Sequence, residues 1–127
     1  MCGISGILSL RSENISKNII HYMNESLNHR GPDDSEIYID NKISLGHKRL
    51  SIIDLTKAAG QPMFSDDGRF IIIYNGEIYN HKELRSTLLK KGHKFHTQSD
   101  TEVALKSFVE WRLESFKKFN GMFAIAI

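Results

Sequence analysis

The run of apolar residues RFIIIYN at positions 69–75 places the strongest limit on how this chain can fold. Its consecutive isoleucines at 71–73 favour a β-strand, and they give that strand no polar face. Such a strand is buried on both sides, so other elements must cover each of its faces. The chain is therefore expected to form a layered structure around this strand.

Other strands are predicted before and after this run. Residues 3–10 alternate small and apolar types in the manner of a buried strand. Residues 35–40 and 43–52 are separated by a short polar pair and indicate a β-hairpin. The apolar residues 121–127 predict one more buried strand, and because no turn or polar residue follows it we expect its edge to be open.

Three helices are indicated between these strands. Apolar residues at helical spacing predict an amphipathic helix over 15–27. Two further helices are marked by a capping residue with a glutamate three positions later, first at Asn80 with Glu83 and then at Ser99 with Glu102. The order of strands and helices favours an α+β domain over repeated βαβ units.

The composition indicates one domain, covering residues 1–127, that acts on a small molecule. The 17 basic and 15 acidic residues are spread along the chain and give a net charge of +2, so no basic block indicates nucleic acid or a membrane surface. With one cysteine the chain forms no internal disulfide. Because no signal sequence or long apolar segment is present, we expect the chain in the cytoplasm.

Cys2 is the only cysteine and lies directly before the first predicted strand. A free α-amine has a pKa of about 7.7–8.0, close to the value of about 8.5 for a thiol. Loss of Met1 would therefore leave one residue that supplies both the attacking sulfur and the base that takes its proton. The alternative is that Cys2 is a small apolar residue at the start of a buried strand.

Asn75 and Gly76 come immediately after the central predicted strand. A side-chain amide and a freely oriented backbone N–H at this point could converge on a developing oxyanion. The alternative is a simple turn, because Asn-Gly is the commonest hairpin dipeptide.

Three charged residues are candidates for binding a substrate. Arg49 lies near a predicted strand end, where its guanidinium could grip a carboxylate or form a surface salt bridge. Asp100 lies in the first turn of a predicted helix, where it could hold an ammonium group or favour the helix dipole and cap. Glu77 poses the same choice between a substrate ligand and an ion pair.

The six histidines show no spacing typical of metal ligands, and a single cysteine gives no zinc pattern. Neither a P-loop nor a GxGxxG motif occurs, so no nucleotide site is indicated. The sequence therefore predicts no metal and no cofactor in this chain.

Seven short motifs follow one another across the whole chain: MCGISGI, RGPDD, GHKRLSIIDL, GQPM, YNGEIYNH, SDTE and FNGMFAIAI. In this order they closely resemble the class II glutamine amidotransferase domain, and most specifically the glutaminase domain of asparagine synthetase. The pair RLSIIDL and NGEIYN favours the asparagine synthetase type over the amidotransferases of purine or glucosamine synthesis.

The resemblance implies an N-terminal nucleophile hydrolase fold, in which two antiparallel sheets pack face to face between helical layers in the order αββα. It also implies hydrolysis of L-glutamine to glutamate and ammonia. Cys2 would attack the amide carbon after loss of Met1, with its own amine as base and then acid. Asn75 and Gly76 match the oxyanion hole of the family.

The resemblance also implies how glutamine is held. Arg49 matches the residue that binds the α-carboxylate, while Glu77 and Asp100 match positions that contact the amino-acid end. Arg30 and Gly31 lie in a loop beside the pocket. These charges suit a zwitterionic substrate.

In the family, further strands normally follow residues 121–127, and asparagine synthetase adds a domain that uses ATP and Mg²⁺. Neither is present in these 127 residues. We therefore expect an incomplete domain that passes ammonia to a synthetase domain or chain, with no cofactor of its own. The open strand edge predicts a homodimer. The alternative function is an inactive truncated domain that binds glutamine or a synthetase chain without turnover, and retention of Met1 would also give an inactive precursor.

Overall fold

The computed structural model describes residues 2–10, 15–52 and 54–127. In chain order its main elements are β1 (Gly3–Leu8), α1 (Lys17–Ser26), β2 (Asp34–Ile39), β3 (Ile43–Arg49), β4 (Met63–Phe64), β5 (Ile71–Ile78), α2 (His81–Lys90), α3 (Asp100–Trp111) and β6 (Gly121–Ala126). Short 3₁₀ helices lie at η1 (Lys57–Ala59) and η2 (Arg112–Lys118). Within the described residues, no helix is long and apolar enough to cross a membrane.

The strands form two antiparallel sheets, with the orders β1-β3-β2 and β4-β5-β6. The predicted hairpin is confirmed as β2 and β3, with Asp34 opposite Arg49. β1 pairs with the other edge of β3, and Gly3 lies opposite Lys48. This register brings Cys2, which precedes β1, next to the end of β3 at Arg49.

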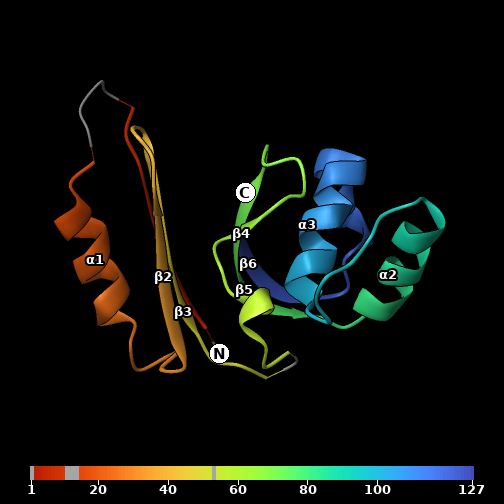
Figure 1. Ribbon diagram of the computed structural model, residues 1–127, viewed down its shortest axis with the longest axis horizontal. Coiled ribbons are helices and arrows are strands. Elements are labelled where there is room, and N and C mark those ends of the chain that lie inside the picture. The colour runs from red at the N-terminus through yellow and green to blue at the C-terminus, as the bar shows by residue number, and fades with distance from the viewer. Residues whose placement is uncertain (1, 11–14, 53) are drawn as a thin grey trace.

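The two sheets face each other between helices, as the family resemblance implies (Figure 1). α1 packs on the outer side of the first sheet, where it contacts β1 and β3. α3 packs on β5 from the outer side of the second sheet, and α2 packs against α3. β1 and β3 contact β5 across the middle of the structure. The layers therefore follow the order αββα.

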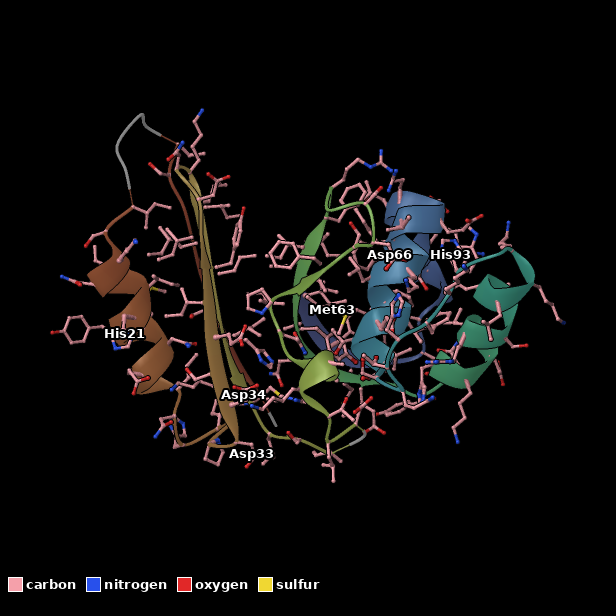
Figure 2. The ribbon with its side chains drawn as sticks, viewed as in Figure 1. His21, Asp33, Asp34, Met63, Asp66 and His93 are labelled. Carbon is pink, nitrogen blue, oxygen red and sulfur yellow. The ribbon has the colours of Figure 1, made fainter. Side chains whose placement is uncertain are left out.

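β5 is buried on both faces, which confirms the interpretation of the apolar run. Ile72, Tyr74 and Ile78 belong to the core cluster that α2 and α3 complete with Leu88 and other apolar side chains. Ile73 is equally buried, and the alternation of side chains along a strand turns it toward the first sheet. Side chains from both sheets fill the space between them (Figure 2).

Several strand predictions are wrong in detail. β1 ends at Leu8, before the predicted end at residue 10, and is only partly buried, since Leu8 is 66% exposed. β5 does not end at Asn75 but continues to Ile78, because β6 pairs with it from Ile73 through Ile78. Asn75 and Gly76 therefore lie inside a strand rather than in a turn after it. β6 is not a buried strand: within the described chain it pairs only with β5, and its Met122 side chain is 71% exposed.

The capping prediction is confirmed at one helix and wrong at the other. The Ser99 hydroxyl accepts a hydrogen bond from the Glu102 N–H at 3.2 Å, so Ser99 caps α3. Asn80 makes no side-chain cap on α2. Its amide instead donates to the Lys118 carbonyl at 2.9 Å and accepts from the Asn120 N–H at 2.9 Å. Asn80 thus joins the start of α2 to the segment that leads into β6.

Candidate active site

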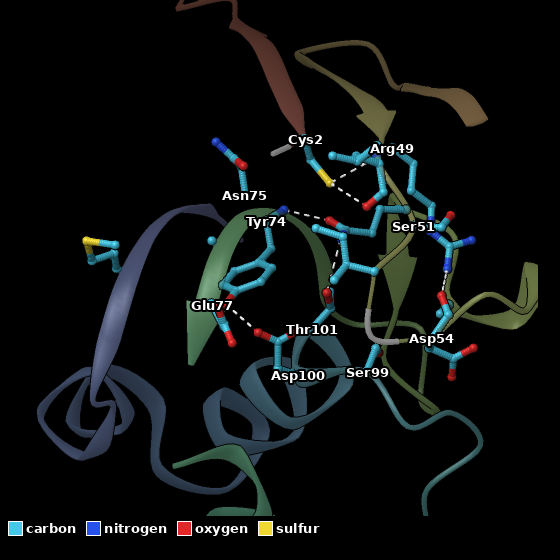
Figure 3. A pocket seen from close by; sticks show the side chains of 16 residues that line it. Cys2, Arg49, Ser51, Asp54, Tyr74, Asn75, Glu77, Ser99, Asp100 and Thr101 are labelled. Carbon is cyan, nitrogen blue, oxygen red and sulfur yellow. Dashed lines mark hydrogen bonds between the residues drawn. The ribbon is translucent and has the colours of Figure 1, made fainter. Parts of the chain in front are cut away.

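A pocket of about 170 Å³ lies where the ends of the two sheets meet α3 (Figure 3). This volume is below the range of about 300–1,000 Å³ typical of sites for drug-sized ligands, so the pocket suits a molecule of amino-acid size. All six residues that the sequence singles out line it: Cys2, Arg49, Asn75, Gly76, Glu77 and Asp100. The fold thus gathers residues from the segment before β1 and from β3, β5 and α3 in one place.

The Cys2 thiol is held against the backbone that follows β3. Its Sγ accepts a hydrogen bond from the Leu50 N–H at 3.4 Å and lies 3.7 Å from the Leu50 carbonyl oxygen. The Arg30 Nε–H donates to the Cys2 carbonyl at 3.1 Å, which fixes the residue from the other side. The sulfur is partly exposed on the pocket wall. Met1, whose loss the nucleophile hypothesis requires, lies outside the described residues.

One edge of β5 presents its N–H groups toward the pocket side rather than toward β6. The Tyr74 N–H donates to Gln61 Oε1 at 2.6 Å, and the Ile78 N–H donates to Asp100 Oδ2 at 3.0 Å. Because N–H direction alternates along a strand, the Gly76 N–H lies on this same edge between them. Asn75 Oδ1 is buried and has no hydrogen-bond partner in the described part of the chain. The Gly76 N–H and the Asn75 side-chain amide therefore remain available to a ligand at this part of the pocket.

Gly76 is also required by packing. A Cβ at this position would lie 2.3 Å from the Met122 carbonyl oxygen and 2.5 Å from Phe123 Cα, both in the backbone of β6. The absence of a side chain thus allows β6 to pair here. The close approach of β6, and not a turn, therefore explains why position 76 is a glycine.

Gly76→Ala is expected to lower the free energy of unfolding by about 1–3 kcal/mol, because overpacking displaces backbone rather than a flexible side chain. Urea unfolding curves measure this change. Gly6→Ala is a matched control in β1, since its new Cβ would come no closer than 3.4 Å to its neighbours. Equal stability of the two variants would contradict the explanation.

Arg49 is a buried cation without an acidic partner. Its side chain is 7% exposed, and its guanidinium donates to the carbonyls of Thr56, at 2.9 Å, and Asp54. Among the described residues it forms no ion pair, so the surface salt-bridge alternative is wrong. Within the described residues two of its five N–H donors are used, which leaves three for a ligand. Because buried charges are normally paired, this side of the pocket is suited to an anion such as a carboxylate.

The Asp54 carboxylate turns away from Arg49. It accepts hydrogen bonds from the Thr56 N–H at 2.8 Å, the Thr56 hydroxyl at 2.6 Å and the Gln98 N–H at 2.7 Å. These bonds, with a smaller effect of the Arg49 charge, hold the pKa of Asp54 below its usual range. Asp54 therefore anchors the loop after β3 to the chain before α3, and among the described residues its carboxylate forms no ion pair with Arg49.

The opposite side of the pocket is acidic (Figure 3). Asp100 is 5% exposed, and its Oδ2 accepts from the Tyr74 hydroxyl at 2.7 Å as well as from the Ile78 N–H. Since Ser99 caps α3, the alternative reading of Asp100 as the cap is wrong. Glu77 makes no ion pair with any described residue. The pocket therefore has a cationic side at Arg49 and an anionic side at Asp100 and Glu77.

Two pocket residues are missed at the sequence level. Tyr74 was assigned only to the buried strand, although a buried tyrosine hydroxyl requires a partner. Gln61 is buried and joins β5 to α3, because its Oε1 accepts from Tyr74 N–H and its Nε2 donates to Thr101 Oγ1 at 3.1 Å. The signal in the sequence is that Gln61 is the polar residue of the GQPM motif, whose other residues are glycine, proline and methionine.

No group of three or more His, Cys, Asp or Glu side chains in the described residues is arranged to hold a metal ion. The pocket offers instead a thiol, backbone and amide polar groups, one cation and three acids, of which Asp54 is already bound by Thr56 and Gln98. These groups are suited to nucleophilic attack on a small zwitterionic molecule.

Two facing antiparallel sheets between helices, with a cysteine at the second position beside a charged pocket, are the features expected of an amidotransferase with the N-terminal nucleophile hydrolase fold. A family model described as a glutamine amidotransferase domain matches residues 1–127, and the chain belongs to this family.

The chain is similar to parts of larger proteins. It is 40% identical over 131 residues to asparagine synthetase [glutamine-hydrolyzing] 3 of Bacillus subtilis, covering 100% of this chain and 21% of that protein. It is 42% identical over 145 residues to putative asparagine synthetase [glutamine-hydrolyzing] 2 of Methanocaldococcus jannaschii, covering 100% of this chain and 27% of that protein. The chain therefore spans about a fifth to a quarter of the relatives it matches.

A solved structure supports the fold. The glutamine phosphoribosylpyrophosphate amidotransferase from B. subtilis, complexed with ADP and GMP, matches with a TM-score of 0.57 and 19% identity. The match covers 96% of this chain and 28% of that one. The predicted αββα class is thereby confirmed.

Proposed function

We propose that this chain is a glutaminase domain, which hydrolyses L-glutamine to glutamate and ammonia. The observation that carries the proposal is the buried Arg49, which has no acidic partner among the described residues and faces Asp100 and Glu77 across a pocket that also contains the Cys2 thiol. This arrangement complements a free amino acid whose side chain reaches the thiol.

Substrate binding follows from the charges. The free N–H groups of Arg49 take the α-carboxylate, since two carbonyls already fix the plane of the guanidinium. Asp100 and Glu77 take the α-ammonium group on the opposite side. The side-chain amide then extends toward Cys2 and the edge of β5.

The chemistry needs a nucleophile, a proton carrier and an oxyanion site. The Cys2 sulfur attacks the amide carbon, and its proton passes to the α-amine freed by loss of Met1. The oxyanion is stabilised by the Gly76 N–H and the Asn75 amide. The C–N bond breaks as the amine returns the proton to the leaving nitrogen, releasing ammonia. Water then hydrolyses the thioester to glutamate and restores the thiol.

The fate of the ammonia is also part of the proposal. The relatives named asparagine synthetases suggest that it passes to a synthetase domain or chain that uses ATP and Mg²⁺. The glutaminase step itself requires no cofactor in this chain, because side chains and the N-terminal amine supply each role. We further propose a cytoplasmic location and a homodimer formed through the edge of β6.

Insertion of a glycine between Met1 and Cys2 is expected to reduce ammonia release by about 10²-fold or more, because the thiol stays while the amine base moves away. Ammonia and glutamate are measured after incubation with glutamine. Intact-mass measurement establishes that wild-type Cys2 is N-terminal, and thiol labelling shows that the inserted variant keeps a reactive sulfur. Full activity in the inserted variant would overturn the mechanism.

The alternative is a domain that binds glutamine without turnover. Calorimetry that detects glutamine binding by the wild-type chain, together with no release of ammonia, would favour it. Activity of the wild-type chain would exclude it.

A further inference from the structure

Asp100 is held by Tyr74 in a way that leaves only one of its carboxylate oxygens free. The Tyr74 hydroxyl and the Ile78 N–H both donate to Oδ2, at 2.7 and 3.0 Å. No hydrogen-bond partner of Oδ1 occurs in the described part of the chain. The two donors therefore fix which oxygen of Asp100 is available in the pocket.

Tyr74 is itself rigidly placed. Its side chain is 3% exposed, and its backbone N–H is bound by Gln61, which in turn donates to Thr101 on α3. The tyrosine thus connects β5 to α3 twice, through its backbone and through its hydroxyl. A carboxylate held by a partner that cannot move keeps one orientation.

We propose that Tyr74 is a positioning residue that makes the pocket selective for amides with a free α-amino group, an inference that rests on the proposed glutaminase function. The hydroxyl holds the free oxygen of Asp100 where it meets a substrate ammonium group. Without it, the carboxylate turns and loses this geometry.

The ionisation of Tyr74 agrees with this role. Burial, followed by the hydrogen bond to Asp100, raises the pKa of Tyr74 far above its usual value. The hydroxyl therefore stays protonated and donates to Asp100 across the working pH range.

Tyr74→Phe tests the proposal with two substrates. Glutamine is compared with glutaramate, which has the same carboxylate and amide but lacks the α-amino group. The variant is expected to raise KM for glutamine about tenfold with kcat nearly unchanged, because one hydrogen bond to a charged group is lost. Its kcat/KM for glutaramate stays near the wild-type value, so the preference for glutamine falls about tenfold.

A merely structural role would lower activity on both substrates equally, and that result would overturn the proposal. Tyr79→Phe is the matched control, because it removes the hydroxyl of a tyrosine whose side chain is 52% exposed. This control variant is expected to keep the wild-type activity on both substrates. Melting temperatures verify that both variants fold.

Binding measurements separate this proposal from the glutaminase proposal. Calorimetry in the Cys2→Ala background gives Kd values for glutamine and glutaramate without turnover. Loss of the preference in Tyr74→Phe supports the positioning role even where the wild type releases no ammonia. A wild-type chain that binds both molecules equally would overturn it, whatever the stability of the Tyr74 variant.

Discussion

Replacement of Cys2 by alanine is expected to lower ammonia release from glutamine by about 10³-fold or more, because the covalent route is lost with the sulfur. Glutamine should still bind, since Arg49 and Asp100 are unchanged and neither forms a hydrogen bond with the thiol in the described part of the chain. The measurement is ammonia production under saturating glutamine, with calorimetry for binding. Loss of turnover with retained binding would assign the sulfur to the chemical step.

The chain offers a clean control for this experiment. Cys2 is the only cysteine, so a thiol reagent modifies one site and should inactivate the wild type to the level of Cys2→Ala. A Cys2→Ala variant with full activity would end the nucleophile hypothesis. A variant that loses binding as strongly as turnover would show that Cys2 acts mainly through the structure of the pocket.

Acidification is expected to destabilise the protein through His47. This side chain is 1% exposed between the sheets, and its Nε2 has no hydrogen-bond partner in the described residues. Burial is the main reason that the pKa of His47 falls from 6.5 to about 4, and the charge of Arg49 adds to it. A hydrogen bond with the Tyr74 backbone and the charge of Asp34 oppose the change.

The direction of the effect follows from this lowered pKa. Below about pH 6.5 the unfolded chain binds a proton at His47 that the folded chain does not bind until about pH 4. The stability from neutral His47 is therefore complete above pH 6.5 and is lost as the pH falls to about 4. This difference between the pKa of His47 in the unfolded and folded chain corresponds to about 3 kcal/mol in the free energy of unfolding.

Urea unfolding at about pH 7 and about pH 4 measures the loss, and His47→Gln isolates it from the titration of carboxylates. Between these two pH values, the free energy of unfolding of the variant should fall by about 3 kcal/mol less than that of the wild type. His21→Gln is the control, because His21 lies exposed on the outer side of α1 (Figure 2). The same pH dependence in wild type and His47→Gln would refute the prediction.

Much of the fold could be predicted from local patterns. The apolar run around Ile72, the hairpin of β2 and β3 and the cap of α3 by Ser99 depend on neighbours a few residues away, and the structure confirms them. The wrong predictions concern residues whose structure depends on a segment distant in the sequence. Gly76 lies in a strand because β6 pairs with it, and Asn80 binds the segment before β6 instead of capping α2.

The residues of the candidate site also fall into two groups, those that the sequence indicates and those that only the structure reveals. The motifs point to Cys2, Arg49, Asn75, Gly76, Glu77 and Asp100, all of which line one pocket. Tyr74 and Gln61 were missed because their importance lies in hydrogen bonds to Asp100 and Thr101, far along the chain.

The sequence by itself determined which chemical groups the proposed chemistry can use, since the position of the single cysteine and the identity of the charged residues do not depend on folding. Only the tertiary structure decided that, in the part of the chain it describes, Arg49 is buried without an acidic partner and one oxygen of Asp100 is left free beside Tyr74. The physical reason is that burial and hydrogen-bond partners are set by segments distant in sequence, which meet only when the two sheets and α3 pack together.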